Sequence, residues 1–155
     1  MPNWCCNELD VMGDGSKVAE FVERVKTSKS DLSFETTVPT CDDDDPDWYT
    51  KTCIAWGVNR DADEVDADGA GYYRFDSAWG PPLLWLARTA LLYPDLTFRL
   101  LYKEPGMAFM GACEIENGVV TDLHLDYGSM RVGKQQESIP EFIQQSEGGL
   151  ARLAM

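Results

Sequence analysis

Residues 72–102 read YYRFDSAWGPPLLWLARTALLYPDLTFRLLY, and this stretch decides the fold. Apolar and polar residues alternate over 72–78 and again over 96–102, which is typical of strands that bury one face. Between them, apolar residues recur at three- and four-residue spacing over 83–91, as in a helix with one buried side. Pro94 marks the end of that helix, because proline cannot continue it. The stretch therefore predicts a strand, a helix and a second strand.

The N-terminal half predicts further elements around this unit. Residues 4–12 alternate between apolar and polar and predict a first strand, and the apolar positions within 18–25 have helical spacing. Residues 32–38 fit either a short strand or an extended loop. The β-like residues 51–59 predict a strand, whereas the Asp-, Ala- and Gly-rich stretch 60–71 predicts a solvated loop.

The C-terminal part predicts a hairpin and a helix. Asn117-Gly118 separates two β-like runs, 107–115 and 119–125, and this dipeptide favours a tight hairpin turn. Ser138 and Glu141 have the spacing of a capping box, which predicts a short helix after them.

In chain order these elements predict an α+β, ferredoxin-like fold. Its βαββαβ order gives an antiparallel sheet with two helices on one face, followed here by a C-terminal β-hairpin and a short helix. We expect one domain over 1–155, with a core over about 3–126 and an appendage over about 127–155.

The charge limits the partners that the protein can bind. Its 155 residues contain 13 Lys and Arg against 27 Asp and Glu, a formal net charge of −14. This argues against direct binding to nucleic acid or to an anionic membrane, because phosphate contacts need Lys and Arg, and favours a basic partner. The alternative is that the acidity only keeps the protein soluble. Five cysteines without a Cys-x-x-Cys pair, and no signal peptide, lead us to expect a reducing, cytoplasmic location.

Several short motifs resemble the YubB-like proteins, small ferredoxin-like proteins of bacteriophages and plasmids. The motifs are Met1-Pro2-Asn3-Trp4-Cys5 with Asn7, Trp56-Gly57 with Asn59, Phe75-Asp76-Ser77-Ala78-Trp79 with Pro81-Pro82, Tyr93-Pro94, and Tyr102 with Glu104-Pro105-Gly106-Met107. The resemblance implies the fold, a mobile-element origin and a bacterial host cell, and it implies no enzymatic activity. The chain departs from the family pattern in Asp42–Asp45 and in the aspartates of 61–68.

Two acidic segments are the candidate partner-binding site. A hairpin between them would bring both to one edge of the sheet, where the carboxylates would match the charge density of DNA phosphates. The hypothesis is a DNA mimic that occludes the basic nucleic-acid site of a host nuclease or CRISPR effector, as an anti-restriction or anti-CRISPR protein. Nearby aromatic residues would anchor the complex. The candidate residues are Asp42, Asp43, Asp44, Asp45, Asp47, Trp48, Tyr49, Asp61, Asp63, Glu64, Asp66 and Asp68. The alternative is a pair of floppy, solvated loops.

A ligand-binding or enzymatic module is the second hypothesis, and an assembly protein of a phage particle is a third. The aromatic pocket of the second hypothesis would be lined by Trp56, Asn59, Trp79, Tyr102, Glu104 and Met107.

Catalytic, metal and cofactor sites have little support in the sequence. His124 is the only histidine, and Cys113 is the one thiol that the hairpin would place near it. A calcium loop that began at Glu64 would need a carboxylate where Phe75 stands. We therefore expect no catalytic residues, no metal and no cofactor.

Overall fold

The described residues form seven strands, which lie in one antiparallel sheet in the order β2-β3-β1-β4-β5-β6-β7. The computed structural model describes the backbone of residues 2–154 and the side chains of residues 2–148. The strands are β1 (Trp4–Met12), β2 (Asp63–Ala67), β3 (Tyr72–Ala78), β4 (Thr97–Glu104), β5 (Phe109–Glu116), β6 (Val119–Asp126) and β7 (Arg131–Ser138). The helices are α1 (Gly15–Arg24), α2 (Trp48–Trp56), α3 (Leu83–Leu92) and α4 (Ile139–Ala154), with a 3-10 turn over Phe34–Thr36.

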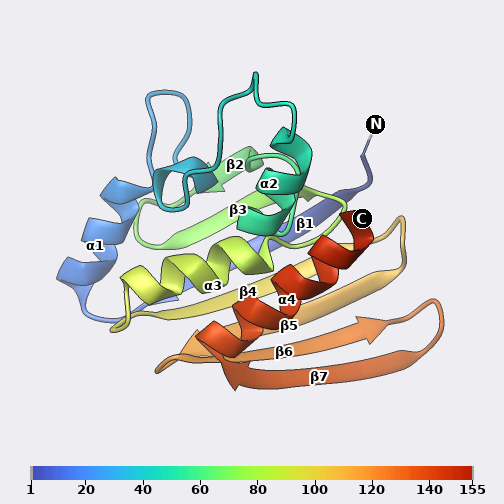
Figure 1. Ribbon diagram of the computed structural model, residues 1–155. Coiled ribbons are helices and arrows are strands. Elements are labelled where there is room, and N and C mark those ends of the chain that lie inside the picture. The colour runs from blue at the N-terminus through green and yellow to red at the C-terminus, as the bar shows by residue number, and fades with distance from the viewer. Residues whose placement is uncertain (1, 155) are drawn as a thin grey trace.

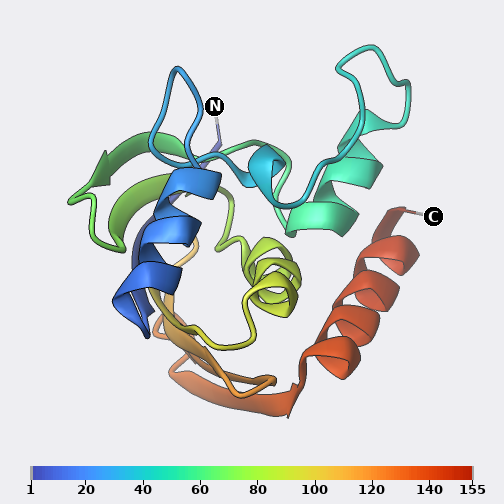
Figure 2. The same cartoon turned by 90° about the vertical axis from the view of Figure 1, so that its left-hand side faces the viewer.

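The helices cover one face of the sheet and leave the other face open (Figures 1 and 2). The four strands β2-β3-β1-β4, with α1 and α3, form the split βαβ unit of a ferredoxin-like fold. The predicted fold class is therefore confirmed, as are the strand–helix–strand over 72–102 and the first strand and helix. Figure 2 shows the sheet curving round α3, which buries Trp85 in the core between sheet and helices.

The predicted strand over 51–59 is wrong, because this segment forms α2. Thr52 and Trp56 lie one turn apart on the buried side, and the indole N–H of Trp56 donates to the carbonyl of Val38 at 2.8 Å. Trp56 also packs edge-on against Phe34, with ring centroids 5.6 Å apart. Gly57 ends the helix at φ +83°, a conformation that glycine adopts without strain. Tertiary packing thus overrides the β-like composition.

The predicted loop over 60–71 is also wrong, since it contains β2. This strand pairs with β3, with Asp66 opposite Arg74, and an irregularity in the register lies between Asp63 and Asp66. Its carboxylates do not prevent pairing because β2 is an edge strand with a solvated side. Charges on an edge also discourage pairing with another chain.

The C-terminal region extends the same sheet. The hairpin of β5 and β6 is confirmed, with Asn117 at φ +51° and Gly118 at φ +79° in its turn. Strand β7 then pairs along all of β6, an element that the sequence did not predict. The predicted capping box is present in part: Ser138 accepts a 3.3 Å hydrogen bond from the backbone N–H of Glu141. The helix that follows has 16 residues, so it is not short.

Candidate functional site

The acidic segment before α2 is an ordered loop. Asp45 forms an ion pair with Lys51 at 2.5 Å, and its other carboxylate oxygen accepts the backbone N–H of Asp47 at 2.8 Å. The hydrogen bond from Lys51 lowers the pKa of Asp45, which favours the ionised carboxylate that the ion pair requires. Asp45 therefore shapes the loop, and its exposed neighbours are left facing water.

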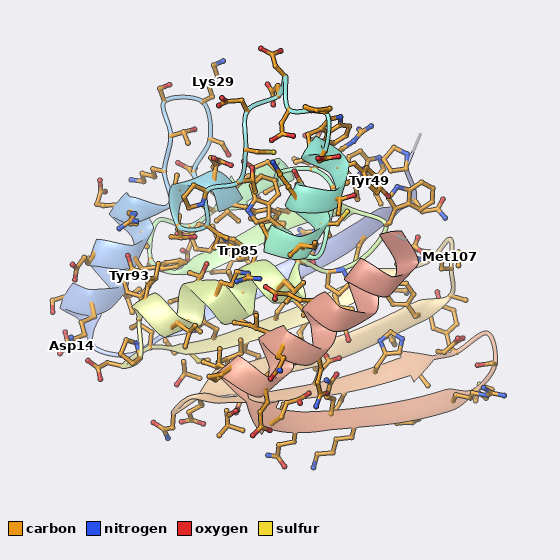
Figure 3. All side chains as sticks on the ribbon, viewed as in Figure 1. Asp14, Lys29, Tyr49, Trp85, Tyr93 and Met107 are labelled. Atoms are coloured by element: carbon orange, nitrogen blue, oxygen red, sulfur yellow. The ribbon has the colours of Figure 1, made fainter. Side chains whose placement is uncertain are left out.

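The loop leads directly into two exposed aromatic residues. Trp48 and Tyr49 are 42% and 54% exposed, although large aromatic side chains usually bury most of their surface. Their rings meet edge to face with centroids 5.7 Å apart, and Figure 3 shows Tyr49 on α2 at the outside of the molecule. We call this surface the α2 patch, which consists of Asp42, Asp43, Asp44, Asp47, Trp48 and Tyr49.

A hollow of about 530 Å³ lies beside the α2 patch. Asp42, Asp43 and Trp48 line it, and Arg60 is the only lysine or arginine among its lining residues. Asn59 lines it too, and within the described part of the chain the Oδ1 atom of Asn59 has no hydrogen-bond donor. The hollow therefore offers acceptors and an aromatic wall.

The second acidic segment does not join the first through a hairpin, because α2 lies between them. The expectation that a hairpin brings both to one sheet edge is therefore wrong. In Figure 2 the 41–47 loop projects beyond α2, whereas β2 lies at the opposite side of the view.

Two carboxylates of the second segment have structural partners. Asp61 accepts hydrogen bonds from the hydroxyl of Ser33 at 2.5 Å and from the backbone N–H of Phe34 at 2.7 Å. Asp68 accepts the backbone N–H groups of Ala70 and Tyr72 in the β2–β3 turn. Both hold local backbone in place, so they are poor candidates for contact with a partner.

The open face of the sheet carries a larger hollow of about 740 Å³, to which all seven strands contribute. The register places Leu101, Ala112 and Leu123 in one row across β4, β5 and β6 on this face. Lys103, Met110, Leu125 and Val132 form the neighbouring row. Towards β2 the lining changes to Glu8, Glu64, Asp66 and Asp76, with Arg74 among them.

The predicted aromatic pocket is not assembled. The hollow beside the α2 patch is lined by Trp56 and Asn59. The other four candidates do not line it: Trp79, Tyr102, Glu104 and Met107. Trp56 is buried in the core, whereas Trp79 is half exposed.

Glu104 and Met107 serve a turn. The Glu104 side chain is buried, and its two oxygens accept the backbone N–H groups of Gly106 at 2.9 Å and Met107 at 2.6 Å. Met107 lies at the outer end of the β4–β5 connection (Figure 3).

Tyr102 belongs to a buried polar group on the helix-covered face. Its hydroxyl donates to Asp122 at 2.8 Å and lies 3.2 Å from Nδ1 of His124. Burial raises the pKa of Asp122, and burial together with the Asp122 carboxylate raises the pKa of Tyr102. Sequence reasoning did not find this group, although alternation along β6 places Asp122 and His124 on one face.

Cys113 is not an activated nucleophile. It lies opposite Asp122 in the β5–β6 register and is buried. Burial and the nearby Asp122 carboxylate raise the pKa of its thiol, the reverse of what a reactive thiolate requires. Among residues 2–148, no group of three or more His, Cys, Asp or Glu side chains is arranged to hold a metal ion.

Residues 54–142 match the model of a protein family described as the ferredoxin-like domain in Api92-like protein. The chain belongs to this family. The match runs from α2 to α4, so six of the seven strands lie within the Api92-like domain, and the 41–47 loop with Trp48 and Tyr49 precedes it. A search of curated proteins and a search of solved structures each gave no match. In the described part of this Api92-like chain, the helices are too short or too polar to span a bilayer.

Proposed function

We propose that this Api92-like protein is a non-enzymatic interaction protein that binds a cationic segment of another protein through the α2 patch. The observation that carries the proposal is the exposure of Trp48 and Tyr49 beside carboxylates on an ordered loop. A few hot-spot residues carry most of the binding energy of an interface, and Trp and Tyr are enriched among them, whereas surrounding charges add selectivity.

The chemistry of the α2 patch suits arginine and lysine. The Trp48 ring offers a face for a guanidinium, since cations bind the faces of aromatic rings. Asp42 and Asp43 lie beside it and can accept charge-assisted hydrogen bonds from the same group. The net charge of −14 attracts a basic surface over a distance set by the ionic strength.

We propose further that the partner is a host defence protein whose basic groove binds nucleic acid. The protein would cover that groove by steric and electrostatic occlusion, without turnover or cofactor. The support is the resemblance of the sequence to a mobile-element family together with the acidic, aromatic character of the α2 patch. A basic groove built for phosphates presents the closely spaced Lys and Arg that this patch suits.

The binding step can be tested with a fluorescent arginine-rich peptide and three variants. In D42N/D43N/D44N the patch loses three charges while Asp45 still closes the loop; W48A/Y49A removes the aromatic anchors. E20Q/E23Q/E116Q removes three exposed charges elsewhere and serves as the matched control. We expect both patch variants to weaken binding at least tenfold and the control to stay within threefold. Equal weakening in the control would show that only net charge matters, and would reject the α2 patch.

The biological step needs a separate readout. In bacteria that carry a restriction or CRISPR system, expression of the protein should raise the plating efficiency of a targeted phage, and D42N/D43N/D44N should abolish the gain. Peptide binding without any effect on plating across such systems would retain the interaction and reject the anti-defence role.

A further inference from the structure

We propose that the open face of the sheet is a second docking surface, which takes a polypeptide segment with aliphatic side chains followed by lysines or arginines. The segment would cross the strands, with its aliphatic part over β4–β7 and its cationic part over β1, β3 and β2. This surface lies on the face of the sheet opposite the helices and is distinct from the α2 patch.

The half of the hollow that β4–β7 line is mostly apolar, and Lys103 is the one Lys, Arg, Asp or Glu among its lining residues there. Leu101 and Leu123 are each 47% exposed, and Val132 is 75% exposed. They share this half with Met110, Ala112 and Leu125, whose side chains the register turns to the same face. Solvated sheet faces normally carry polar residues at such positions. A contiguous apolar group of this kind, set in a hollow, marks an interaction site more often than single exposed leucines do.

The other half of the open face is acidic. Its part of the hollow is lined by four carboxylates: Glu8 on β1, Asp76 on β3, and Glu64 and Asp66 on β2. Arg74 is the only cation among them on these three strands, and it lies 3.9 Å from Glu8. The acidic half thus keeps an excess of carboxylates for a cationic guest. The boundary between the halves runs between β1 and β4, where Glu8 faces Leu101 across the ladder.

This division sets the chemistry of the guest, with one aliphatic end and one basic end. Neighbouring strands lie about 4.8 Å apart, so six steps from β2 to β7 span roughly 29 Å. A helix rises 1.5 Å per residue, so about 19 residues would cross the face, with about the first half aliphatic and the rest basic. The carboxylates oppose a nucleic acid, whose phosphates they would repel. Two copies packed face to face would cover the apolar halves and leave both acidic halves unmatched.

The experiment uses a labelled block peptide of about 19 residues, with leucines at helical spacing in its first half and lysines in its second. A peptide of the same composition with the two residue types interleaved is its control. We expect the full-length protein to bind the block peptide at least tenfold more tightly than the interleaved one. L101Q/L123Q should reduce binding at least tenfold, and E64Q/D66N should weaken it and flatten its salt dependence.

Matched variants separate this surface from general effects. L91Q/L92Q replaces two leucines that are equally exposed, at 51% each, at the end of α3, and E20Q/E23Q removes two charges from α1. Both should bind the block peptide as the wild type does. D42N/D43N/D44N should also retain it, which distinguishes failure here from failure of the α2 patch.

Three results would overturn the proposal. Equal binding of the block and interleaved peptides would mean that the face does not distinguish separate aliphatic and basic halves from a mixture of the two. Dimerisation of the wild type that L101Q/L123Q abolishes, without peptide binding, would assign the face to a second copy of this chain. Tighter binding of an oligothymidine than of the block peptide would assign it to single-stranded nucleic acid.

Discussion

The hydroxyl of Tyr102 donates a 2.8 Å hydrogen bond to Asp122, and both residues are buried between the sheet and the helices. Burial raises the pKa of Asp122 above its ordinary value of 3.8 despite this bond. The folded state therefore holds the Asp122 proton more tightly than the unfolded state does. The stability that follows is complete below the ordinary pKa and is lost as the pH rises through the raised pKa.

Replacement D122N should remove this pH dependence. The amide that replaces the carboxyl group keeps an oxygen that can accept the Tyr102 hydroxyl, and it cannot ionise. The free energy of unfolding of D122N, measured with urea between pH 4 and pH 8, should therefore rise relative to that of the wild type as the pH increases. A relative fall over the same range would show that the ionised carboxylate is the form that the fold prefers.

Gly111 is required where the Tyr102 ring crosses β5. A Cβ atom at Gly111 would lie 2.2 Å from Cζ and Oη of Tyr102 and 2.6 Å from the carbonyl oxygen of Leu123. Replacement G111A should cost about 1–3 kcal/mol in the free energy of unfolding, as overpacked sites do. The cost of G111A should be smaller in a Y102L background than in the wild type, because the ring contact is gone while the backbone contact stays. An unchanged urea midpoint in G111A would contradict this packing.

Glu104 holds the β4–β5 turn through its two hydrogen bonds to backbone N–H groups. Replacement E104A should lower the free energy of unfolding by about 1–3 kcal/mol, because Gly106 and Met107 lose their acceptor. E104Q should cost less, since its amide retains one acceptor oxygen. E116A, at an exposed carboxylate of β5, is the control and should change stability by less than about 0.5 kcal/mol. Equal effects of E104A and E116A would show that the turn does not depend on Glu104.

The sequence predicts those elements whose patterning and packing agree. Over residues 72–102 the spacing of the apolar residues matches the spacing of the buried positions. The central strands and α3 therefore follow from hydrophobic periodicity. Residues 48–67 do not, because α2 forms where Trp56 finds Phe34, far away in sequence, and β2 is polar because it lies at an edge. Neither the contact of Trp56 with Phe34 nor the edge position of β2 can be recognised from a short stretch of sequence.

The candidate surfaces were predictable to different degrees. The carboxylates and aromatics of the α2 patch stand together in the sequence, so composition alone indicated them. The open face needed the register: adjacent Leu100 and Leu101 must lie on opposite faces of β4, so one leucine had to meet water. That single signal was present. The partners of Leu101 on β5, β6 and β7 depend on a sheet order that no local pattern reveals.

Asp61 should separate structural carboxylates from those that recognise a partner. The sequence predicted that Asp61 contacts a partner. In the structure its oxygens accept hydrogen bonds from the Ser33 hydroxyl and the Phe34 N–H, at the start of the 3-10 turn. D61A leaves both donors without an acceptor, so we expect a loss of about 1–3 kcal/mol in urea unfolding. D42N/D43N/D44N changes only exposed side chains and should stay within about 0.5 kcal/mol of the wild type, or gain slightly from reduced repulsion. D61N, which keeps an acceptor oxygen, should lie between D61A and the wild type. If D61A unfolds like the wild type while the triple variant is destabilised, the assignment is wrong. The carboxylates at 42–44 would then be structural, and Asp61 would be free to contact a partner.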